Sequence, residues 1–107
     1  MNTNNGQEYF TNLIHKHKIV LFSKPCCHLC DEIKTYLKEN SYGFENVDVT
    51  QLEDQYDIDG IELVEMIKSQ TQSNMFPFCY YEGQYVDTHE IKKKLIKLKF
   101  NWDNEDF

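Results

Sequence analysis

The densest group of chemically reactive side chains in this sequence lies between residues 23 and 30. The segment reads Ser-Lys-Pro-Cys-Cys-His-Leu-Cys and contains a C-x-x-C pair, Cys27 and Cys30. Two cysteines three residues apart on the first turn of a helix can form and break a disulfide without moving the backbone. This spacing predicts a redox-active pair, with Cys27 as the exposed nucleophile and Cys30 as the buried resolving thiol.

The segments on either side of the cysteines favour this interpretation. The continuous apolar run of residues 19–22 predicts a buried strand, and the apolar repeat of residues 29–37 predicts an amphipathic helix that begins at the cysteines. Free N–H groups and the positive end of the dipole at a helix N-terminus stabilise a thiolate. Lys24 and His28 add two potential cations beside Cys27, so we expect Lys24 to stabilise its thiolate.

Other interpretations of the cysteines remain open. A zinc site would need two ligands beyond Cys27 and Cys30, but only Cys79 and four scattered histidines are left, without a second paired spacing. A structural disulfide is disfavoured in an intracellular chain. Cys26 would precede the helix, so we interpret it as a bystander. Cys79 falls on a predicted buried strand, where a cysteine usually acts as a small core residue.

Composition predicts one compact globular domain. The 107 residues are 40% hydrophobic and include seven Tyr, seven Phe and one Trp, enough bulk for one core. The net charge of -7 would repel phosphate backbones and anionic lipid headgroups, so we expect no nucleic-acid or membrane partner. Residues 1–6 lack the basic and apolar regions of a signal peptide. We therefore expect a cytoplasmic monomer.

Hydrophobic periodicity predicts the element order α-β-α-β-α-β-β-α. The acidic segment 51–60 is expected to be a loop or a frayed helical turn, and Gly83 should supply the positive φ of a tight hairpin turn. The expected helices are residues 7–18, 29–38, 61–67 and 91–98, and the expected strands are residues 19–22, 44–49, 78–81 and 84–86.

Taken together, these motifs resemble those of the glutaredoxins of the thioredoxin superfamily, from the opening helix to about Leu98. Residues 19–30 match the family's strand, Ser-Lys and C-x-x-C, with C-H-L-C in place of the usual C-P-Y-C. Met75-Phe76-Pro77 stands where the family has Thr-Val-Pro with a cis proline, and residues 82–86 match its hairpin turn and following strand. The resemblance implies an α/β, thioredoxin-like fold in residues 1–99, with a four-stranded mixed sheet flanked by helices.

The resemblance also implies a thiol-disulfide oxidoreductase that uses glutathione as its co-substrate. Cys27 would attack a protein disulfide or a glutathione mixed disulfide, and Cys30 or a second glutathione would resolve the product. The backbone of Phe76, before a cis Pro77, would pair with glutathione, and Lys24 would meet its glycine carboxylate. His28 replaces the family's usual proline, a change sometimes compatible with a glutathione-bridged iron–sulfur cluster. A carrier of such a cluster is therefore an alternative, although we do not expect a bound cluster or another metal.

One departure from the family concerns the site of glutathione's γ-glutamyl end. The family usually has Gly-Gly, then Ser or Cys, then Asp, whereas this chain has the shorter sequence Asp87-Thr88-His89-Glu90. Asp87 would add negative charge near an anionic ligand, and the chain contains no arginine to offset it. The alternative is a thioredoxin-like disulfide reductase that takes electrons from a reductase instead of glutathione.

Residues 100–107 form an acidic tail with three aromatic residues, Phe100, Trp102 and Phe107. Its end, Asn-Glu-Asp-Phe, is similar to the tail by which the small subunit of eukaryotic-type ribonucleotide reductase docks on the large subunit. Aromatic anchors suit such docking, and a tether would raise the effective concentration of Cys27 near its acceptor. We therefore count the ribonucleotide reductase large subunit among the expected partners. A disordered tail and a tail-mediated binding module are the alternatives.

Overall fold

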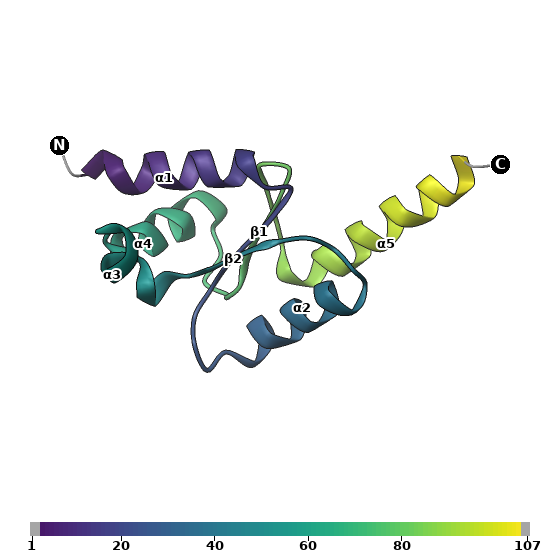
Figure 1. Ribbon diagram of the computed structural model, residues 1–107, viewed down its shortest axis with the longest axis horizontal. Helices are drawn as coiled ribbons and strands as arrows, with labels where there is room; N and C mark the ends of the chain where they lie inside the picture. Colours follow the sequence, from purple (N-terminus) through teal and green to yellow (C-terminus); the bar gives the residue numbers. More distant parts are fainter. Residues whose placement is uncertain (1–2, 106–107) are drawn as a thin grey trace.

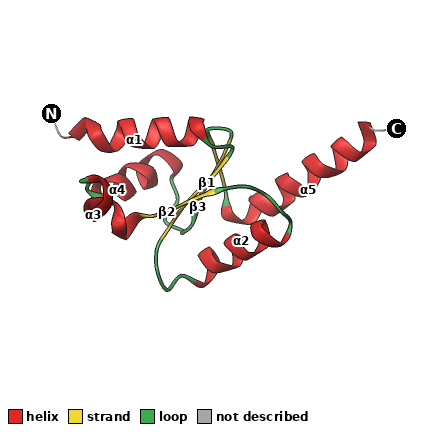
Figure 2. Ribbon diagram, viewed as in Figure 1, coloured by secondary structure: helices red, strands yellow, loops and turns green. Residues whose placement is uncertain are grey.

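A computed structural model of the chain describes the backbone of residues 3–105 and the side chains of residues 6–96. A central sheet carries helices on both faces (Figures 1 and 2). The elements are α1 (Thr3–Lys16), β1 (Ile19–Ser23), α2 (His28–Glu39), β2 (Glu45–Asp48), η1 (Val49–Gln51), α3 (Leu52–Tyr56), α4 (Gly60–Thr71), β3 (Phe78–Tyr81), β4 (Gln84–Val86) and α5 (Thr88–Glu105).

The sheet has four strands in the order β2-β1-β3-β4. β1 pairs in parallel with β2, where Phe22 faces Val47, and antiparallel with β3, where Phe22 faces Phe78. β3 and β4 form an antiparallel hairpin. Since parallel neighbours need a crossover, α2 lies between β1 and β2 in the chain. The predicted four-stranded mixed sheet and thioredoxin-like fold are confirmed.

The central strand β1 is buried on both faces, as its apolar sequence predicts. Alternate side chains of β1 enter two cores, because successive residues of a strand point to opposite faces. Val20 and Phe22 pack with α1 and α4, whereas Ile19 and Leu21 pack with α2 and α5. Figure 1 shows the same division, with α1 and α4 on one side of the strands and α2 and α5 on the other.

The β3–β4 turn has the geometry that the sequence predicts. Glu82 and Gly83 have φ angles of 51° and 83°, as in a type I′ hairpin turn. Such a turn matches the twist of the paired strands. The positive φ predicted for Gly83 is confirmed, and a side chain there would also meet the ring of His15.

The acidic segment before α4 is more ordered than the predicted loop. It forms the 3-10 turn η1 and the short helix α3, and Leu52 is 1% exposed in the core. Asp57 ends α3 in the left-handed conformation, and Ile58 returns to the core. Asp59 then caps α4 by accepting hydrogen bonds from the backbone N–H groups of residues 61 and 62. Buried Leu52 and Ile58 stabilise this segment despite its acidic composition.

The last helix is longer than the sequence predicts. α5 continues to Glu105 instead of ending near Leu98, and Figure 1 shows its C-terminal half extending away from the sheet. The backbone of the predicted tail is therefore helical to Glu105, and Asp106 and Phe107 lie outside the described residues. The division into a domain of residues 1–99 and a tail of residues 100–107 stays a prediction. None of the described helices, α5 included, is long and apolar enough to span a membrane.

Candidate active site

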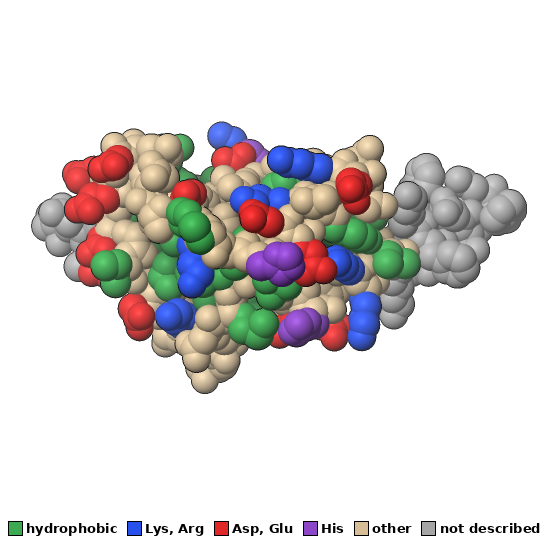
Figure 3. Space-filling view, turned by 90° about the horizontal axis from the view of Figure 1, so that it is seen from below, with side chains coloured by type: hydrophobic (Ala, Val, Ile, Leu, Met, Phe, Trp, Pro, Cys, Tyr) green, Lys and Arg blue, Asp and Glu red, His purple; other side chains and the backbone are tan. Residues whose placement is uncertain are grey.

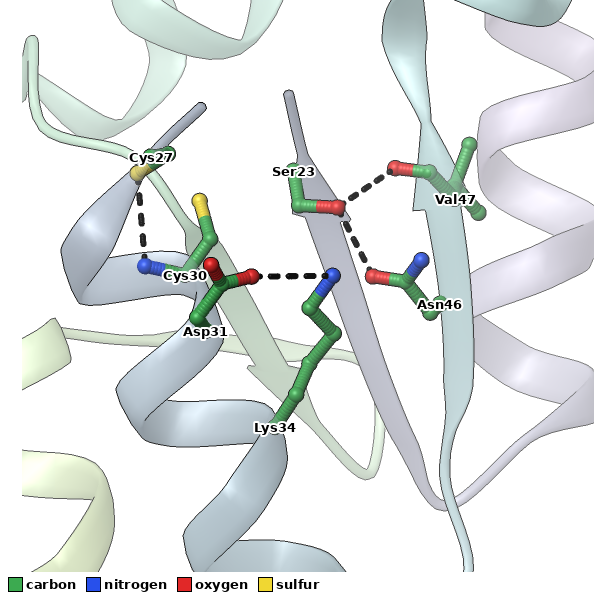
Figure 4. A network of polar contacts seen from close by, with 7 residues as sticks. All are labelled: Ser23, Cys27, Cys30, Asp31, Lys34, Asn46 and Val47. Carbon is green, nitrogen blue, oxygen red and sulfur yellow. Dashed lines mark hydrogen bonds and ion pairs between the residues drawn. The ribbon is translucent and has the colours of Figure 1, made fainter. Parts of the chain in front are cut away.

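Cys27 is the N-cap residue of α2, and Cys30 lies in the first turn of the same helix. The backbone of Cys27 is extended, and its Sγ accepts a hydrogen bond of 3.3 Å from the Cys30 backbone N–H (Figure 4). Cys27 is partly exposed, whereas Cys30 has an exposed fraction of 0%. A partly exposed sulfur that faces helix N–H groups is well placed for attack on an incoming disulfide.

The surroundings of Cys30 favour its protonated form. Burial raises the pKa of the Cys30 thiol from 9.0 to about 12, and its interaction with the Cys27 side chain raises it too. A backbone hydrogen bond from Lys24 and the charge of Lys34 act in the opposite direction. Cys30 therefore keeps its proton at neutral pH and must lose it before it can act as a nucleophile.

Lys24 and Phe76 are brought together by the pairing of β1 with β3. The two strands are paired as far as Phe22 and Phe78, and Lys24 and Phe76 each lie two residues beyond this last pair. The Lys24 Nζ lies 4.9 Å from the centroid of the Phe76 ring, a cation–π contact. The Phe76 ring in turn packs edge-on against Phe78, at 5.0 Å between centroids. Two residues predicted to bind glutathione are thus in contact, with Lys24 exposed and Phe76 partly buried.

The Phe76–Pro77 peptide bond is cis, as the resemblance implies. Pro77 is fully buried, and its carbonyl oxygen accepts a 2.9 Å hydrogen bond from Thr88 Oγ1 at the start of α5. Thr88 is itself only 4% exposed. Sequence reasoning missed this role of Thr88. The sequence offers little signal for it beyond the position of a threonine three residues before the expected last helix.

A second side-chain bond holds the end of β1. Ser23 is 2% exposed, and its Oγ donates to Asn46 Oδ1 at 2.7 Å on β2 (Figure 4). Ser23 immediately precedes Lys24 in the sequence, so this bond fixes the point from which the cysteine loop leaves the sheet. Sequence reasoning identified the Ser-Lys pair as part of a motif but gave Ser23 no role.

His28 occupies a different part of the surface from the Lys24–Phe76 pair. It is exposed at the first position of α2 and lines a shallow groove with Asp31, Glu32 and Tyr36 of α2 and with Lys92 of α5. Figure 3 shows the molecule from below Figure 1, where α2 lies lowest, with acidic, basic and histidine side chains interspersed on this face. The structure therefore groups His28 with α2 and α5.

Cys26 and Cys79 lie in contrasting places, and all four cysteines are free. Cys26 is exposed and has a φ of 57°, which is uncommon for a residue other than glycine. Cys79 is fully buried in the core on β3, and burial raises its pKa to about 12. Within the described part of the chain, no group of three or more His, Cys, Asp or Glu side chains lies close enough together to hold a metal ion.

Asp87 caps α5 and stands where the glutaredoxins, which the sequence resembles, usually have two glycines. Its carboxylate accepts a hydrogen bond of 2.8 Å from the His89 N–H, and its carbonyl oxygen accepts from the N–H groups of Glu90 and Ile91. These N–H groups would otherwise be free at the helix end. The cap therefore occupies donors that could serve an anionic ligand, and it places a negative charge there.

Comparisons with known proteins agree with this geometry. The family model described as "Glutaredoxin-like domain (DUF836)" matches residues 18–97. The structure is similar to the solution structure of reduced glutaredoxin C1 from Populus tremula x tremuloides, with a TM-score of 0.75 and 18% identity, covering 92% of this chain and 81% of that one. It is also similar to a buckwheat glutaredoxin–glutathione complex, with a TM-score of 0.74 and 17% identity, covering 92% and 86% of the two chains.

A curated relative shares a shorter stretch of sequence. N-acetyl-S-hydroxy-L-cysteine reductase of Bacillus subtilis (strain 168) is 45% identical over 40 residues, which is 37% of this chain and 43% of the relative. The aligned part thus spans less than half of that protein. The family match, by contrast, covers most of this chain and includes the cysteine pair and the cis proline. The chain belongs to the glutaredoxin-like family of thiol oxidoreductases, in the thioredoxin superfamily.

Proposed function

We propose that the protein reduces disulfides by thiol-disulfide exchange, with Cys27 as the nucleophile and Cys30 as the resolving thiol. The observation that carries this assignment is the contrast between the two sulfurs: Cys27 is a partly exposed helix cap, and Cys30 is fully buried one turn inside the helix. Substrates reach the first sulfur and are excluded from the second.

The reaction needs two exchange steps. The Cys27 thiolate attacks one sulfur of a disulfide R–S–S–R′ and breaks its S–S bond, which forms the mixed disulfide Cys27 Sγ–S–R and releases R′–SH after protonation. Cys30 then loses its proton and attacks Cys27 Sγ, so that the Cys27–Cys30 disulfide forms and R leaves as a thiol. Two electrons pass from the cysteine pair to the substrate. A second glutathione could replace Cys30 in the resolving step.

Glutathione is the proposed co-substrate. Lys24 offers an exposed ammonium group for the glycine carboxylate, and the backbone beside the cis Phe76–Pro77 bond can pair with an extended peptide. A buckwheat glutaredoxin of the same fold has been solved as a complex with glutathione. His28 stands at the start of α2, near enough in the chain to contact a ligand bound to Cys27.

The test is reduction of a small glutathione mixed disulfide, coupled to glutathione reductase, by the wild type, Cys27→Ser and Cys30→Ser. We expect turnover by the wild type and by Cys30→Ser, and none by Cys27→Ser. Cys26→Ser is the matched control, since it removes an exposed neighbouring thiol, and should remain active. An active Cys27→Ser variant would overturn the assignment. If only thioredoxin reductase supports protein-disulfide reduction, exchange chemistry stands and glutathione dependence fails.

A second candidate substrate is a small sulfenic acid, because the Bacillus relative is named a reductase of N-acetyl-S-hydroxy-L-cysteine. Cys27 would attack the S-hydroxy sulfur and release water, and Cys30 would resolve the resulting mixed disulfide to give the free thiol. The carboxylate of such a substrate suits Lys24. Formation of the free thiol by the wild type but not by Cys27→Ser would support this candidate. Equal rates for the wild type and Cys27→Ser would exclude it.

The location proposed for the protein rests on its cysteine pair. We infer a monomer in the cytoplasm, where a cysteine pair is kept reduced between cycles.

We also propose that residues 100–107 tether the protein to the large subunit of ribonucleotide reductase. Truncation after Leu98 should weaken binding to a cognate large subunit while leaving reduction of a small disulfide unchanged. Unchanged binding would contradict the tether.

A further inference from the structure

Lys34 lies on the face of α2 that carries the resolving cysteine. It follows Cys30 by four residues, a spacing that places two side chains one above the other on a helix. Figure 4 shows the Lys34 side chain running back along α2 toward its N-terminal turn, where Asp31 and Cys30 lie. The Lys34 ammonium is 3.7 Å from the Asp31 carboxylate. An ordinary surface lysine would instead extend into water.

The two members of this ion pair differ in exposure. The Lys34 side chain is 26% exposed, whereas that of Asp31 is 72% exposed. The cation is thus the inner member and is partly desolvated, and the more exposed Asp31 carboxylate pairs with it. A charge in such a place is screened less than one at the surface, so it acts more strongly on nearby groups.

We propose that Lys34 is a positioning residue for the resolving step: its ammonium group, held by Asp31, stabilises the thiolate that Cys30 must become before it attacks the mixed disulfide on Cys27. This inference rests on the proposed roles of the two cysteines. In this inference Lys34 acts through Cys30 and takes no part in the first attack, which Cys27 makes.

Other groups also act on the pKa of the Cys30 thiol, and burial raises it most. Cys27 acts on it from the helix cap and Lys24 acts from the preceding loop through its backbone. Cys79 of β3 is near enough that Cys30 raises the pKa of the Cys79 thiol. Among the side chains that act on Cys30, that of Lys34 is the one whose charge favours its thiolate. Removing this charge should therefore slow the resolving step specifically.

The expected size follows from thiolate chemistry. A partly exposed opposite charge changes a neighbouring pKa by at most about one unit, and a full unit corresponds to a tenfold change in thiolate population. A more basic thiolate is also a better nucleophile, and a Brønsted coefficient of about 0.4–0.5 recovers roughly threefold. Loss of the Lys34 charge should therefore slow resolution about threefold at a given pH, which displaces its pH profile by about half a unit toward higher pH.

The experiment follows two releases of thionitrobenzoate from dithiobis(nitrobenzoate) by stopped flow, in a Cys26→Ser background that removes the exposed bystander. Attack by Cys27 gives the first release, and attack by Cys30 on the mixed disulfide gives the second. Lys34→Gln should slow the second release about threefold across pH 6–9 and leave the first unchanged. Lys34→Arg, which keeps the charge, should restore the second rate.

Lys38→Gln is the matched control, because it removes the same charge from an exposed position one turn further along α2. It should leave both releases unchanged. A second release that is equally fast in Lys34→Gln and the wild type would overturn the inference, and so would equal slowing by Lys38→Gln. Absence of the first release in the wild type would instead contradict the proposed function, so the two failures are distinguishable.

Discussion

The hydroxyl group of Thr88 donates a 2.9 Å hydrogen bond to the carbonyl oxygen of Pro77, which joins the start of α5 to the cis Phe76–Pro77 bond. Both residues are buried. The bond fixes one side of the site in the same way that the Ser23–Asn46 bond fixes the other. Two buried hydroxyl groups thus hold the backbone segments between which a substrate peptide would lie.

Thr88→Val should separate this role from simple packing. Valine keeps the shape but loses the hydroxyl group, so the Pro77 carbonyl oxygen keeps only the long 3.8 Å contact from Cys79 Sγ, and the free energy of unfolding should fall by about 1–2 kcal/mol. Thr88→Ser keeps the bond and loses a methyl group, at a cost of about 1 kcal/mol. Urea unfolding should show similar losses, but only Thr88→Val should raise KM for a glutathione mixed disulfide. Equal KM values for the two variants would contradict this.

Asp87→Asn should improve the use of glutathione. Asparagine caps a helix as well as aspartate does, so stability should change by less than about 0.5 kcal/mol. Loss of the carboxylate removes repulsion of an anionic ligand, and KM for the glutathione mixed disulfide should fall about twofold at low salt. Glu82→Gln, at the far end of β3, is the control and should have no effect on KM. A KM unchanged in Asp87→Asn would show that glutathione does not approach α5.

Stability should fall as the pH rises above 9. The pKa values of Cys30 and Cys79 are raised from 9.0 to about 12 in the fold, so these thiols ionise in the unfolded chain first. The unfolded state then binds fewer protons than the folded state, and the free energy of unfolding decreases with pH until the folded thiols also ionise. Cys79→Val removes one such group and should reduce the slope between pH 9 and 10 by up to about 1.4 kcal/mol per unit. An unchanged slope would contradict the burial of this thiol.

Gly60→Ala should destabilise the protein by about 1–3 kcal/mol. A Cβ atom on Gly60 would overlap the carbonyl oxygen of Val49, where the start of α4 approaches η1. Gly43→Ala is the matched control, because a Cβ there would meet nothing within 4 Å and should be tolerated. Thermal unfolding of both variants tests this, and a similar Tm for the two would contradict the close approach.

Local patterns in the sequence predicted the elements that carry the site. The apolar run of β1 and the repeat of α2 place Cys27 and Cys30 at a strand–helix joint, since both signals lie within twenty residues of the chain. The hairpin turn at Gly83 was predicted because its sequence signal also lies within a short stretch of the chain. Helix α3 was expected only as a loop or a frayed helical turn, because its acidic sequence has few apolar residues and its stability comes from burial of Leu52 against distant elements.

The contacts that complete the site depend on strand pairing and could not be predicted from spacing. Lys24 meets Phe76 only through the β1–β3 register, and Thr88 meets Pro77 only after β4 has returned the chain. The ion pair of Asp31 with Lys34 follows from helical spacing, but the partial burial of Lys34 does not. Sequence alone thus located the cysteine pair at the strand–helix joint, and tertiary packing determined the groups that surround it.

In the proposed function Cys27, and not its more exposed neighbour Cys26, attacks the substrate. The most direct measurement is to treat Cys30→Ser with oxidised glutathione, which stops the reaction at the mixed disulfide, and to map the adduct by peptide mass spectrometry. We predict one glutathione per chain, on Cys27. An adduct on Cys26, or no adduct at all, would contradict the account.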